Sequence, residues 1–459
     1  MFIAELPYRE DSAGLFSLWS QTPWSVFLDS ARPNSQLGRY DILATRPRMT
    51  LVTKGNVTEI RSREGIRLSP EDPFLLLKHA LGEPIESAAV PFCGGAIGYF
   101  SYDLARRLEK IPAFTSEVDA IPEMAVGIYD WAVVVDHQAR QSFLVGKEKP
   151  ATEGFWREMK ETLVSLRPRM PGGFYLHTSI QSNMNWHEYQ QSFERIQHYI
   201  REGDCYQVNF AQRFSARASG DPWRAYTDLR QINPAPFGAF LRHPQMTILS
   251  SSPERFLKVR EGRVETKPIK GTRPRGRMPE EDFYLVEALS ESIKDRAENL
   301  MIVDLLRNDL SKTCQLGSVK VPHLFEVESF ASVHHLVSTV TGELDPANHA
   351  LDLLRGCFPG GSITGAPKIR AMEIIEELET LRRGVYCGSI GYIGYDGTMD
   401  TNIAIRTMVH SGNNIHFWAG GGIVSDSIAQ REYQESFDKA SSLIQVLSRY
   451  QLATNRVGG

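Results

Sequence analysis

Cysteine is scarce in this chain of 459 residues, and its five cysteines are scattered without any Cys-x-x-Cys pair. That spacing excludes a zinc ribbon and a disulfide framework, and it is typical of a protein of the reducing cytoplasm. Long apolar runs are also missing, since no segment reaches the roughly 20 apolar residues of a membrane-spanning helix. The opening MFIAELPYRE carries acidic residues and no apolar stretch, so we expect no signal peptide.

The chain also lacks a large excess of either positive or negative charge. The 51 Lys and Arg residues nearly balance the 55 Asp and Glu residues, which leaves a net charge of −4. A balanced charge excludes the strongly basic surface that nucleic acids and anionic membranes attract. Because 42% of the residues are hydrophobic, the chain can bury a large core. We therefore expect a folded cytoplasmic protein whose partners are neither nucleic acid nor membrane.

One stretch of the chain has the composition of a joint between domains. Arg167–Gly173 reads RPRMPGG and is followed by polar sequence, and such Pro and Gly clusters interrupt both helical and strand periods. We predict an N-terminal domain over residues 1–165 and a second domain over residues 180–450.

The second half begins with a strong helix pattern. Asn185 can cap the helix, Gly203 can end it, and apolar residues recur between them at helical spacing, at Tyr189, Phe193, Ile196 and Ile200.

Strand patterns and helix patterns then alternate irregularly along the chain. Single strands are expected over residues 125–135, 206–214 and 403–409, and long helices over residues 282–308, 367–377 and 427–449. Mixed runs of this kind favour an α+β fold over a doubly wound parallel sheet. The predicted class is an α/β sandwich of large antiparallel β-sheets with flanking helices.

Two of the expected helices carry acidic pairs. Asp295 and Glu298 are three residues apart, as are Glu432 and Glu435, so each pair lies on one helix face. Facing one another, such helices would form an oxygen-rich site suited to Mg²⁺. The alternative is a solvated acidic surface.

Other candidate groups are equally open to two interpretations. The glycine-rich segments Pro359–Lys368 and Ala419–Val424 can bind an anion or simply form tight turns. Lys270 is either a nucleophile of lowered pKa or a surface lysine. Glu254 is a general acid or the partner of Arg255. The pair His334-His335 holds a catalytic histidine or packs in the core, and Arg406 has the strand position of a carboxylate clamp.

Taken together, these segments resemble a known family. SSPERF, KPIKGT, DRAENLMIVDLLRNDL, ASVHHLVST, FPGGSITGAPKIRAMEIIEELE, CGSIGYIGYDGTMDTNIAIRT, AGGGIVSDS and YQESFDKA occur in this order between about residues 185 and 447. The series is similar to that of the chorismate-utilising enzymes, which include anthranilate synthases, isochorismate synthases and aminodeoxychorismate synthases. The resemblance implies an anthranilate synthase component I-like fold with its active site between the sheets.

Position 270 separates the branches of that family. The C2-aminating anthranilate synthases resemble PIAGT at this point, whereas this chain has PIKGT, the pattern of the branch that aminates chorismate at C4. The resemblance thus implies synthesis of 4-amino-4-deoxychorismate, on the route to 4-aminobenzoate and folate, by transfer of an amino group. The alternative within the family is anthranilate synthesis. Gln207 stands where the water-using members carry a lysine, which disfavours water as the nucleophile.

The resemblance also implies roles for single residues. Lys270 is the covalent nucleophile, Glu254 the general acid and base, and His335 the active-site histidine. Mg²⁺ is the implied cofactor, held by Glu298, Glu435 and Glu432, with Asp295 behind them. The implied chorismate contacts are Gln207, Gly271, Thr272, Thr364, Tyr392, Arg406, Gly420, Gly421 and Gly422.

The first half resembles the N-terminal domain of the family, which contributes to a tryptophan pocket. The implied pocket residues are Ser30, Leu37, Gly38, Arg39, Tyr40, Pro236, Phe237 and Gly238. The usual entrance motif LLES is replaced by Phe27-Leu28-Asp29-Ser30, a departure that disfavours feedback inhibition. L-Tryptophan would then be a structural ligand, and the alternative is that these residues only pack the two halves together.

A glutaminase is not encoded in this sequence. The chain has no G-x-C-x-G nucleophile turn, since Cys93 has glycines on one side only. The resemblance therefore implies a separate glutamine amidotransferase subunit that delivers ammonia.

Overall fold

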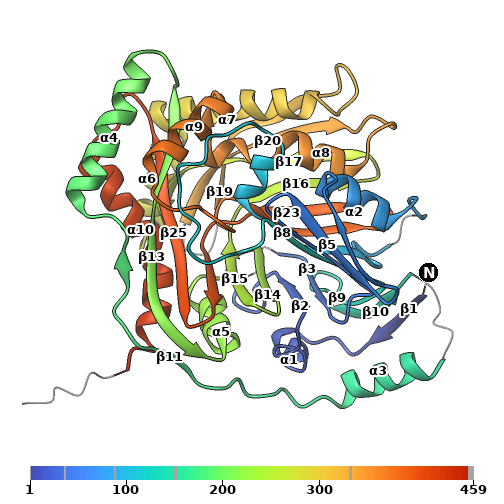
Figure 1. Cartoon of the computed structure of the whole chain (residues 1–459). Helices are drawn as coiled ribbons and strands as arrows, with labels where there is room; N and C mark the ends of the chain where they lie inside the picture. The colour runs from blue at the N-terminus through green and yellow to red at the C-terminus, as the bar shows by residue number, and fades with distance from the viewer. Residues whose placement is uncertain (1, 36–37, 87–88, 148–152, 330–332, 453–459) are drawn as a thin grey trace, which may run out of the picture.

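Two large antiparallel sheets form the centre of the molecule (Figure 1). The computed structural model describes residues 2–35, 38–86, 89–147, 153–329 and 333–452. Within this part of the chain, every ladder between named strands is antiparallel. The predicted class of large antiparallel sheets with flanking helices is therefore confirmed.

The first sheet has 13 strands. Its order in space is β1 (Phe2–Leu6), β10 (Gln141–Gly146), β9 (Trp131–Asp136), β3 (Tyr40–Ala44), β2 (Ser25–Asp29), β14 (Phe237–Arg242), β15 (Met246–Ser252), β24 (Thr407–Ser411), β25 (Asn414–Ile423), β13 (Gln207–Gly220) and β11 (Phe174–Leu176), with β12 (Gln181–Ser182) and β21 (Gly365–Ala366) also paired to β13.

The second sheet has 12 strands. Its order is β18 (Ile269–Pro274), β20 (Val333–Glu343), β17 (Arg263–Thr266), β16 (Arg255–Arg260), β23 (Met399–Ile403), β22 (Ser389–Gly394), β7 (Gly95–Phe100), β8 (Met124–Tyr129), β4 (Met49–Lys54), β5 (Val57–Ser62) and β6 (Gly65–Ser69), with β19 (Lys320–Ser329) paired to β20.

Helices cover the outer faces of both sheets. They are α1 (Ala13–Phe16), α2 (Pro73–Leu81), α3 (Glu153–Ser165), α4 (Trp186–Arg201), α5 (Pro222–Ile232), α6 (Pro279–Ser290), α7 (Ile293–Ser311), α8 (Ala350–Cys357), α9 (Lys368–Leu378) and α10 (Ala429–Ser448), with 3₁₀ turns η1 (Tyr102–Arg107) and η2 (Gly361–Ile363). Helix α10 packs on β25, and α7 packs on β18 and β20. None of the helices in the described ranges is both long enough and apolar enough to span a bilayer.

Apolar side chains from the two sheets meet between them. Ile42 and Ile248 of the first sheet share a buried cluster with Ile97 and Ile390 of the second. Further apolar clusters lie under the helices on the outer faces. Because both faces of the central strands are covered, strands such as β9 are buried along their whole length.

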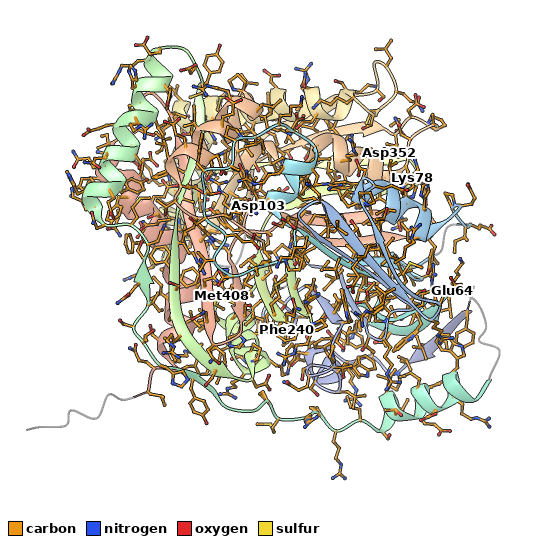
Figure 2. The ribbon with its side chains drawn as sticks, in the orientation of Figure 1. Glu64, Lys78, Asp103, Phe240, Asp352 and Met408 are labelled. Carbon is orange, nitrogen blue, oxygen red and sulfur yellow. The ribbon has the colours of Figure 1, made fainter. Side chains whose placement is uncertain are left out.

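Both sheets combine strands from residues 1–165 with strands from residues 180–450. Ion pairs join the two segments as well. Lys78 Nζ of α2 lies 2.7 Å from Asp352 Oδ2 of α8 (Figure 2), and Arg230 Nε of α5 donates to the buried Asp29 Oδ2 of β2 at 2.7 Å. The proposed division between residues 165 and 180 stays a prediction, and the two segments share their sheets.

The helix predicted after Asn185 is confirmed. Asn185 accepts a hydrogen bond from the Glu188 amide while the Glu188 side chain accepts from the Asn185 amide, which is a capping box. Tyr189 and Phe193 are buried on its inner face. The cap and the apolar spacing, both local in sequence, thus mark where this helix begins and which face it buries.

Three other predicted elements are interrupted. Residues 125–135 form β8 and β9, which belong to different sheets. Residues 282–308 form α6 and α7, because the Ser292 side chain caps a new helix by accepting from the Asp295 amide. Residues 403–409 break between β23 and β24, where Arg406 has a φ of 52°.

Candidate active site

Lys270 and Gly271 lie in a bulge of strand β18. The ladder between β18 and β20 shifts register between Ile269 and Thr272, and such a bulge redirects a side chain away from the regular pleat. Gly271 has a φ of 80° and packs so closely on α7 that an added Cβ would lie 2.9 Å from Asp295 Cγ. Only glycine fits this position without strain. The bulge thus sets the direction of Lys270.

Glu254 and Lys270 are brought together around Ser362. Glu254 is 6% exposed, and it accepts a hydrogen bond of 2.9 Å from Ser362 Oγ to its Oε1. The Lys270 amine donates to the Ser362 carbonyl oxygen at 3.5 Å. The predicted acid and nucleophile therefore share one neighbour on η2.

Burial moves both groups toward their neutral forms. It raises the pKa of Glu254 to about 7, although the Ser362 hydrogen bond and the positive charge of Lys270 act in the opposite direction. Burial also lowers the pKa of Lys270, against the attraction of Glu298, and the nearby charge of Lys439 lowers it further. Burial thus favours a protonated acid beside a neutral amine.

His335 lies beside the bulge. Its Nδ1 is 2.9 Å from Thr272 Oγ1. Burial lowers the pKa of His335 to about 4, and the neighbouring Arg406 acts in the same direction. The imidazole is therefore neutral at pH 7, which suits a hydrogen-bonding group better than a cationic one.

Arg406 is a partly buried guanidinium without a carboxylate. Burial lowers its pKa, and among the described residues no ion pair to Arg406 occurs. A cation in this setting is suited to bind an anionic ligand. This agrees with the predicted carboxylate clamp.

Gln207 is fully buried on β13, and neither side-chain polar atom has a hydrogen-bond partner in the described part of the chain. It faces Gly422, where an added Cβ would lie 2.8 Å from Gln207 Nε2. An unpaired buried amide is costly, so a ligand is its expected partner. Thr364 differs, because its hydroxyl donates to the carbonyls of Gly360 and Gly361 and holds their turn.

Three glutamates of α7 and α10 lie near Gly421 of β25 or around Lys294 of α7. A Cβ added to Gly421 would lie 3.1 Å from Glu435 Oε1 and 3.5 Å from Glu432 Oε2. Lys294 Nζ lies 3.9 Å from Glu298 Oε1 and 4.0 Å from Glu432 Oε1. The structure therefore brings the predicted acidic pairs together across the two helices. Gly421 leaves the space into which two carboxylates point.

Lysines balance this acidic group. Lys439 Nζ lies 2.6 Å from Glu435 Oε1 and donates to the Gly420 carbonyl at 3.0 Å. Burial tends to raise the pKa of Glu435, but the charge and hydrogen bond of Lys439, together with the charges of Lys270 and Lys294, lower it. Burial raises the pKa of Glu298 and of Glu432. Asp295 is occupied by Arg273, whose Nη2 donates to it at 3.0 Å.

The carboxylates fit a magnesium ion in number and charge. Within the described ranges no three His, Cys, Asp or Glu side chains are already arranged as a ligand set. Mg²⁺, however, needs only one or two protein carboxylates and keeps other positions for water and substrate oxygens. Glu432 and Glu435 converge over Gly421. The Lys294 ammonium lies near both Glu298 and Glu432, which places Glu298 beside the other two. The residues present are therefore compatible with the ion.

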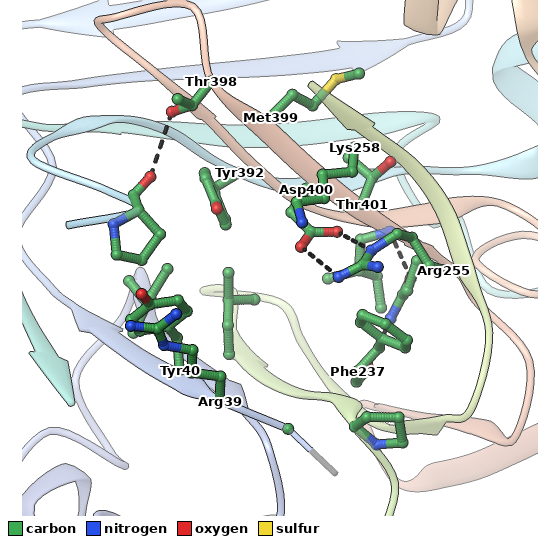
Figure 3. A pocket seen from close by; sticks show the side chains of 18 of the residues that line it. Arg39, Tyr40, Phe237, Arg255, Lys258, Tyr392, Thr398, Met399, Asp400 and Thr401 are labelled. Atoms are coloured by element: carbon green, nitrogen blue, oxygen red, sulfur yellow. Dashed lines mark hydrogen bonds and ion pairs between the residues drawn. The ribbon is translucent and has the colours of Figure 1, made fainter. Parts of the chain in front are cut away.

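A second site lies between the sheets (Figure 3). It is a cavity of about 280 Å³. Six predicted tryptophan-pocket residues line it, namely Gly38, Arg39, Tyr40, Pro236, Phe237 and Gly238. Ser30 lies behind Gly38, with its hydroxyl bound to Asp41, and Leu37 falls outside the described residues.

Tyr392 lines this second cavity and is not grouped with Lys270. Its strand β22 pairs with β23 in the second sheet. The ring faces the cavity between the sheets and packs edge-on against Phe92, with the ring centres 5.4 Å apart. Its predicted contact with chorismate thus has no support from its position.

Asp29 lies in the altered entrance motif, and its carboxylate is hydrogen-bonded within the protein. Its carboxylate accepts from Arg230 at 2.7 Å and from the Tyr226 hydroxyl at 2.9 Å. The Ala31 amide donates to it at 2.7 Å. Its carboxylate is therefore already occupied.

Sequence reasoning missed Lys294 and Lys439 and left Ser362 without a role toward Glu254. Lys439 had a signal, since it follows Glu435 by four residues on one helix. The contact of Ser362 with Glu254 spans 108 residues of sequence and left no local pattern.

Comparisons with known proteins agree with this arrangement. A family model described as chorismate binding enzyme matches residues 27–445. Aminodeoxychorismate synthase component 1 from Klebsiella aerogenes is 48% identical over 447 residues, covering 96% of this chain and 98% of that protein. The Escherichia coli K12 protein of the same name is 47% identical, covering 97% and 98%.

A solved relative has the same architecture. Anthranilate synthase component I from Streptococcus pneumoniae TIGR4 matches with a TM-score of 0.78 at 33% identity, covering 89% of this chain and 93% of that one. The fold that the sequence motifs imply is thereby confirmed.

Replacing Glu254 should stabilise the protein at alkaline pH. Because the folded pKa of about 7 exceeds the ordinary 4.5, its ionisation costs stability as pH rises through this range, by up to about 3 kcal/mol. Glu254→Gln should therefore raise the free energy of unfolding at pH 8, with little difference near pH 4.5. Urea unfolding at both pH values measures this, with exposed Glu202→Gln as the control. Equal stability of Glu254→Gln and wild type at pH 8 would contradict the expected shift.

Proposed function

This chain belongs to the family of chorismate-binding enzymes, and from that membership we propose that it converts chorismate and ammonia to 4-amino-4-deoxychorismate on the route to 4-aminobenzoate and folate. The observation that carries the proposal is Lys270, a lysine in a bulge, held with Glu254 around Ser362. The names of the relatives with 47–48% identity support the same branch. Anthranilate synthesis is the alternative, because 37% identical relatives carry that name.

The proposed reaction has two displacement steps. The neutral amine of Lys270 adds to C2 of chorismate, the C4–oxygen bond breaks, and Glu254 gives its proton to the hydroxyl, which leaves as water. Ammonia then adds at C4 while the bond from C2 to Lys270 breaks, and the Glu254 carboxylate takes the proton that ammonia loses. Because Lys270 occupies C2, the new amine is directed to C4.

Other residues of the site would bind and orient the substrate. Arg406 is suited to one carboxylate of chorismate, and the unpaired amide of Gln207 supplies a donor and an acceptor. Glu298, Glu432 and Glu435 would hold magnesium. When bound, that ion would supply a Lewis acid for the other carboxylate of the substrate.

We also propose that ammonia comes from a separate glutamine amidotransferase. The "component 1" names of the relatives support this, since they imply a second component. Free ammonium would replace that partner in the tests below.

Lys270→Ala should abolish C4 amination. With the nucleophile gone, ammonia itself can take C2, so the products should shift toward anthranilate. Chromatography with mass detection of reactions containing chorismate, Mg²⁺ and ammonium measures the products. Intact mass of acid-quenched wild type should show a chorismate-minus-water adduct that the variant lacks.

The matched control is Lys267→Ala, whose lysine belongs to the same segment but pairs with Glu328 at 2.8 Å. The control should keep the C4 product. Continued formation of aminodeoxychorismate by Lys270→Ala would refute the covalent role.

Glu298→Gln should weaken magnesium binding by about tenfold or more, because a charged oxygen ligand is replaced by a neutral one. The Mg²⁺ concentration at half-maximal rate, and that at the midpoint of its thermal-stability increase, both measure the change. Asp304→Asn, on the exposed face of the same helix and paired with Arg307, is the control. Unchanged Mg²⁺ dependence of Glu298→Gln would remove this residue from the proposed metal site.

The cavity between the sheets should bind L-tryptophan without inhibition of chorismate turnover. Phe237 forms part of its wall and its ring lies 4.9 Å from the Arg255 guanidinium. Phe237→Ala should therefore weaken tryptophan binding about tenfold through lost apolar contact, as measured by calorimetric titration of protein freed of ligand. The control is Phe283→Ala, whose ring is exposed. Inhibition of the wild type by saturating tryptophan would instead indicate a feedback site.

A further inference from the structure

We infer that Ser362 is a positioning residue that determines which oxygen of Glu254 carries the transferred proton. This inference rests on the function proposed above, in which Glu254 protonates the leaving hydroxyl. It adds a residue that acts on the acid and not on the substrate.

The contact between the two side chains is buried on both sides. Ser362 is 7% exposed and Glu254 is 6% exposed. Ser362 Oγ donates to Glu254 Oε1 at 2.9 Å. A proton on Oε1 would compete with this donor, so Oε1 remains the acceptor and the acidic proton belongs on Oε2. The orientation of the hydroxyl thereby selects the catalytic oxygen.

The turn that carries Ser362 is held from three sides. Gly361 lies against α7 so closely that an added Cβ would be 2.5 Å from Leu305 Cδ2. The Thr364 hydroxyl donates to the carbonyls of Gly360 and Gly361. The Asn209 amide of β13 donates to the Thr364 carbonyl at 2.8 Å. Ser362 therefore has a fixed position relative to β13 and α7.

The same residue also reaches the nucleophile. Its carbonyl oxygen accepts from Lys270 Nζ at 3.5 Å, and no direct ion pair of Lys270 with Glu254 is found in the part of the chain that the structure describes. One residue thus contacts the acid through its side chain and the amine through its backbone. A side-chain substitution separates these two contacts, because it leaves the carbonyl in place.

Ser362→Ala should lower kcat with ammonium by about 10- to 100-fold, a part of what a general acid contributes. KM for chorismate should change less than about twofold, since Ser362 contacts the acid. In the wild type the Ser362 hydrogen bond lowers the pKa of Glu254, so its loss should raise that pKa and move the alkaline limb of kcat to higher pH. Ser362→Thr keeps a hydroxyl and should restore most of kcat.

The control is Ser20→Ala, which removes a buried hydroxyl that donates to the Ser17 carbonyl at 3.1 Å. It should keep the wild-type rate and pH profile. A change in KM alone, an unmoved alkaline limb, or a Ser362→Thr variant as defective as Ser362→Ala would each overturn the positioning role.

A titration without turnover separates this inference from the proposed function. Proteins labelled with ¹³C at the glutamate carboxyl carbons can be titrated by NMR, with Glu254→Gln identifying the signal. The Glu254 signal should titrate near pH 7 in the wild type and at higher pH in Ser362→Ala. An unshifted signal overturns the inference even if the enzyme is active. A shifted signal with no aminodeoxychorismate formed by wild type would instead reject the proposed reaction.

Discussion

Poor solvation of Glu254 and Lys270 is the physical constraint on which the rest of the site depends. Water would keep the carboxyl charged and the amine protonated, and neither form is useful for displacing a hydroxyl with an amine. Burial between β16, β18 and η2 disfavours both charges. Their mutual attraction opposes this effect but is weaker than burial for both groups. Burial thus favours the protonated form of Glu254 and the neutral form of Lys270 together.

Two glycines supply the geometry that this constraint requires. Gly271 lets β18 bulge against α7 with a left-handed backbone, so that Lys270 leaves the plane of the ladder. Gly421 leaves open the space above β25 into which Glu432 and Glu435 point. A larger residue at position 271 would clash with Asp295, and one at position 421 would crowd Glu435. The close packing of sheet and helix, and not any single strong bond, therefore holds the site.

The sequence predicts the parts of this molecule that depend on local chemistry. Asn185 and Glu188 cap α4 through neighbouring atoms, and the spacing of Glu298 and Glu435 on their helices was sufficient to place them on usable faces. The family motifs then indicated that these helices face one another. The confirmed fold follows from the same motifs, since they include strands of both sheets.

What the sequence did not predict depends on distant packing. Residues 125–135 look like one apolar strand, but the chain passes from the second sheet to the first at Asp130. Tyr392 belongs to a family motif, but only the structure shows that its side chain faces the cavity between the sheets. The role of Asp29 was likewise hidden, because Arg230 approaches it from 201 residues away.

The lysines around the acidic group explain how it can form before any cation binds. Three carboxylates brought together in a partly buried position repel one another, and burial adds to the cost. Lys294 lies between Glu298 and Glu432, while Lys439 pairs with Glu435. Both lysines are partly exposed, so in the proposed magnesium site their ammonium groups would move into solvent as the ion took over the neutralisation. The acidic group is thereby kept assembled, and Lys439 at the same time adds to the positive field that favours a neutral Lys270.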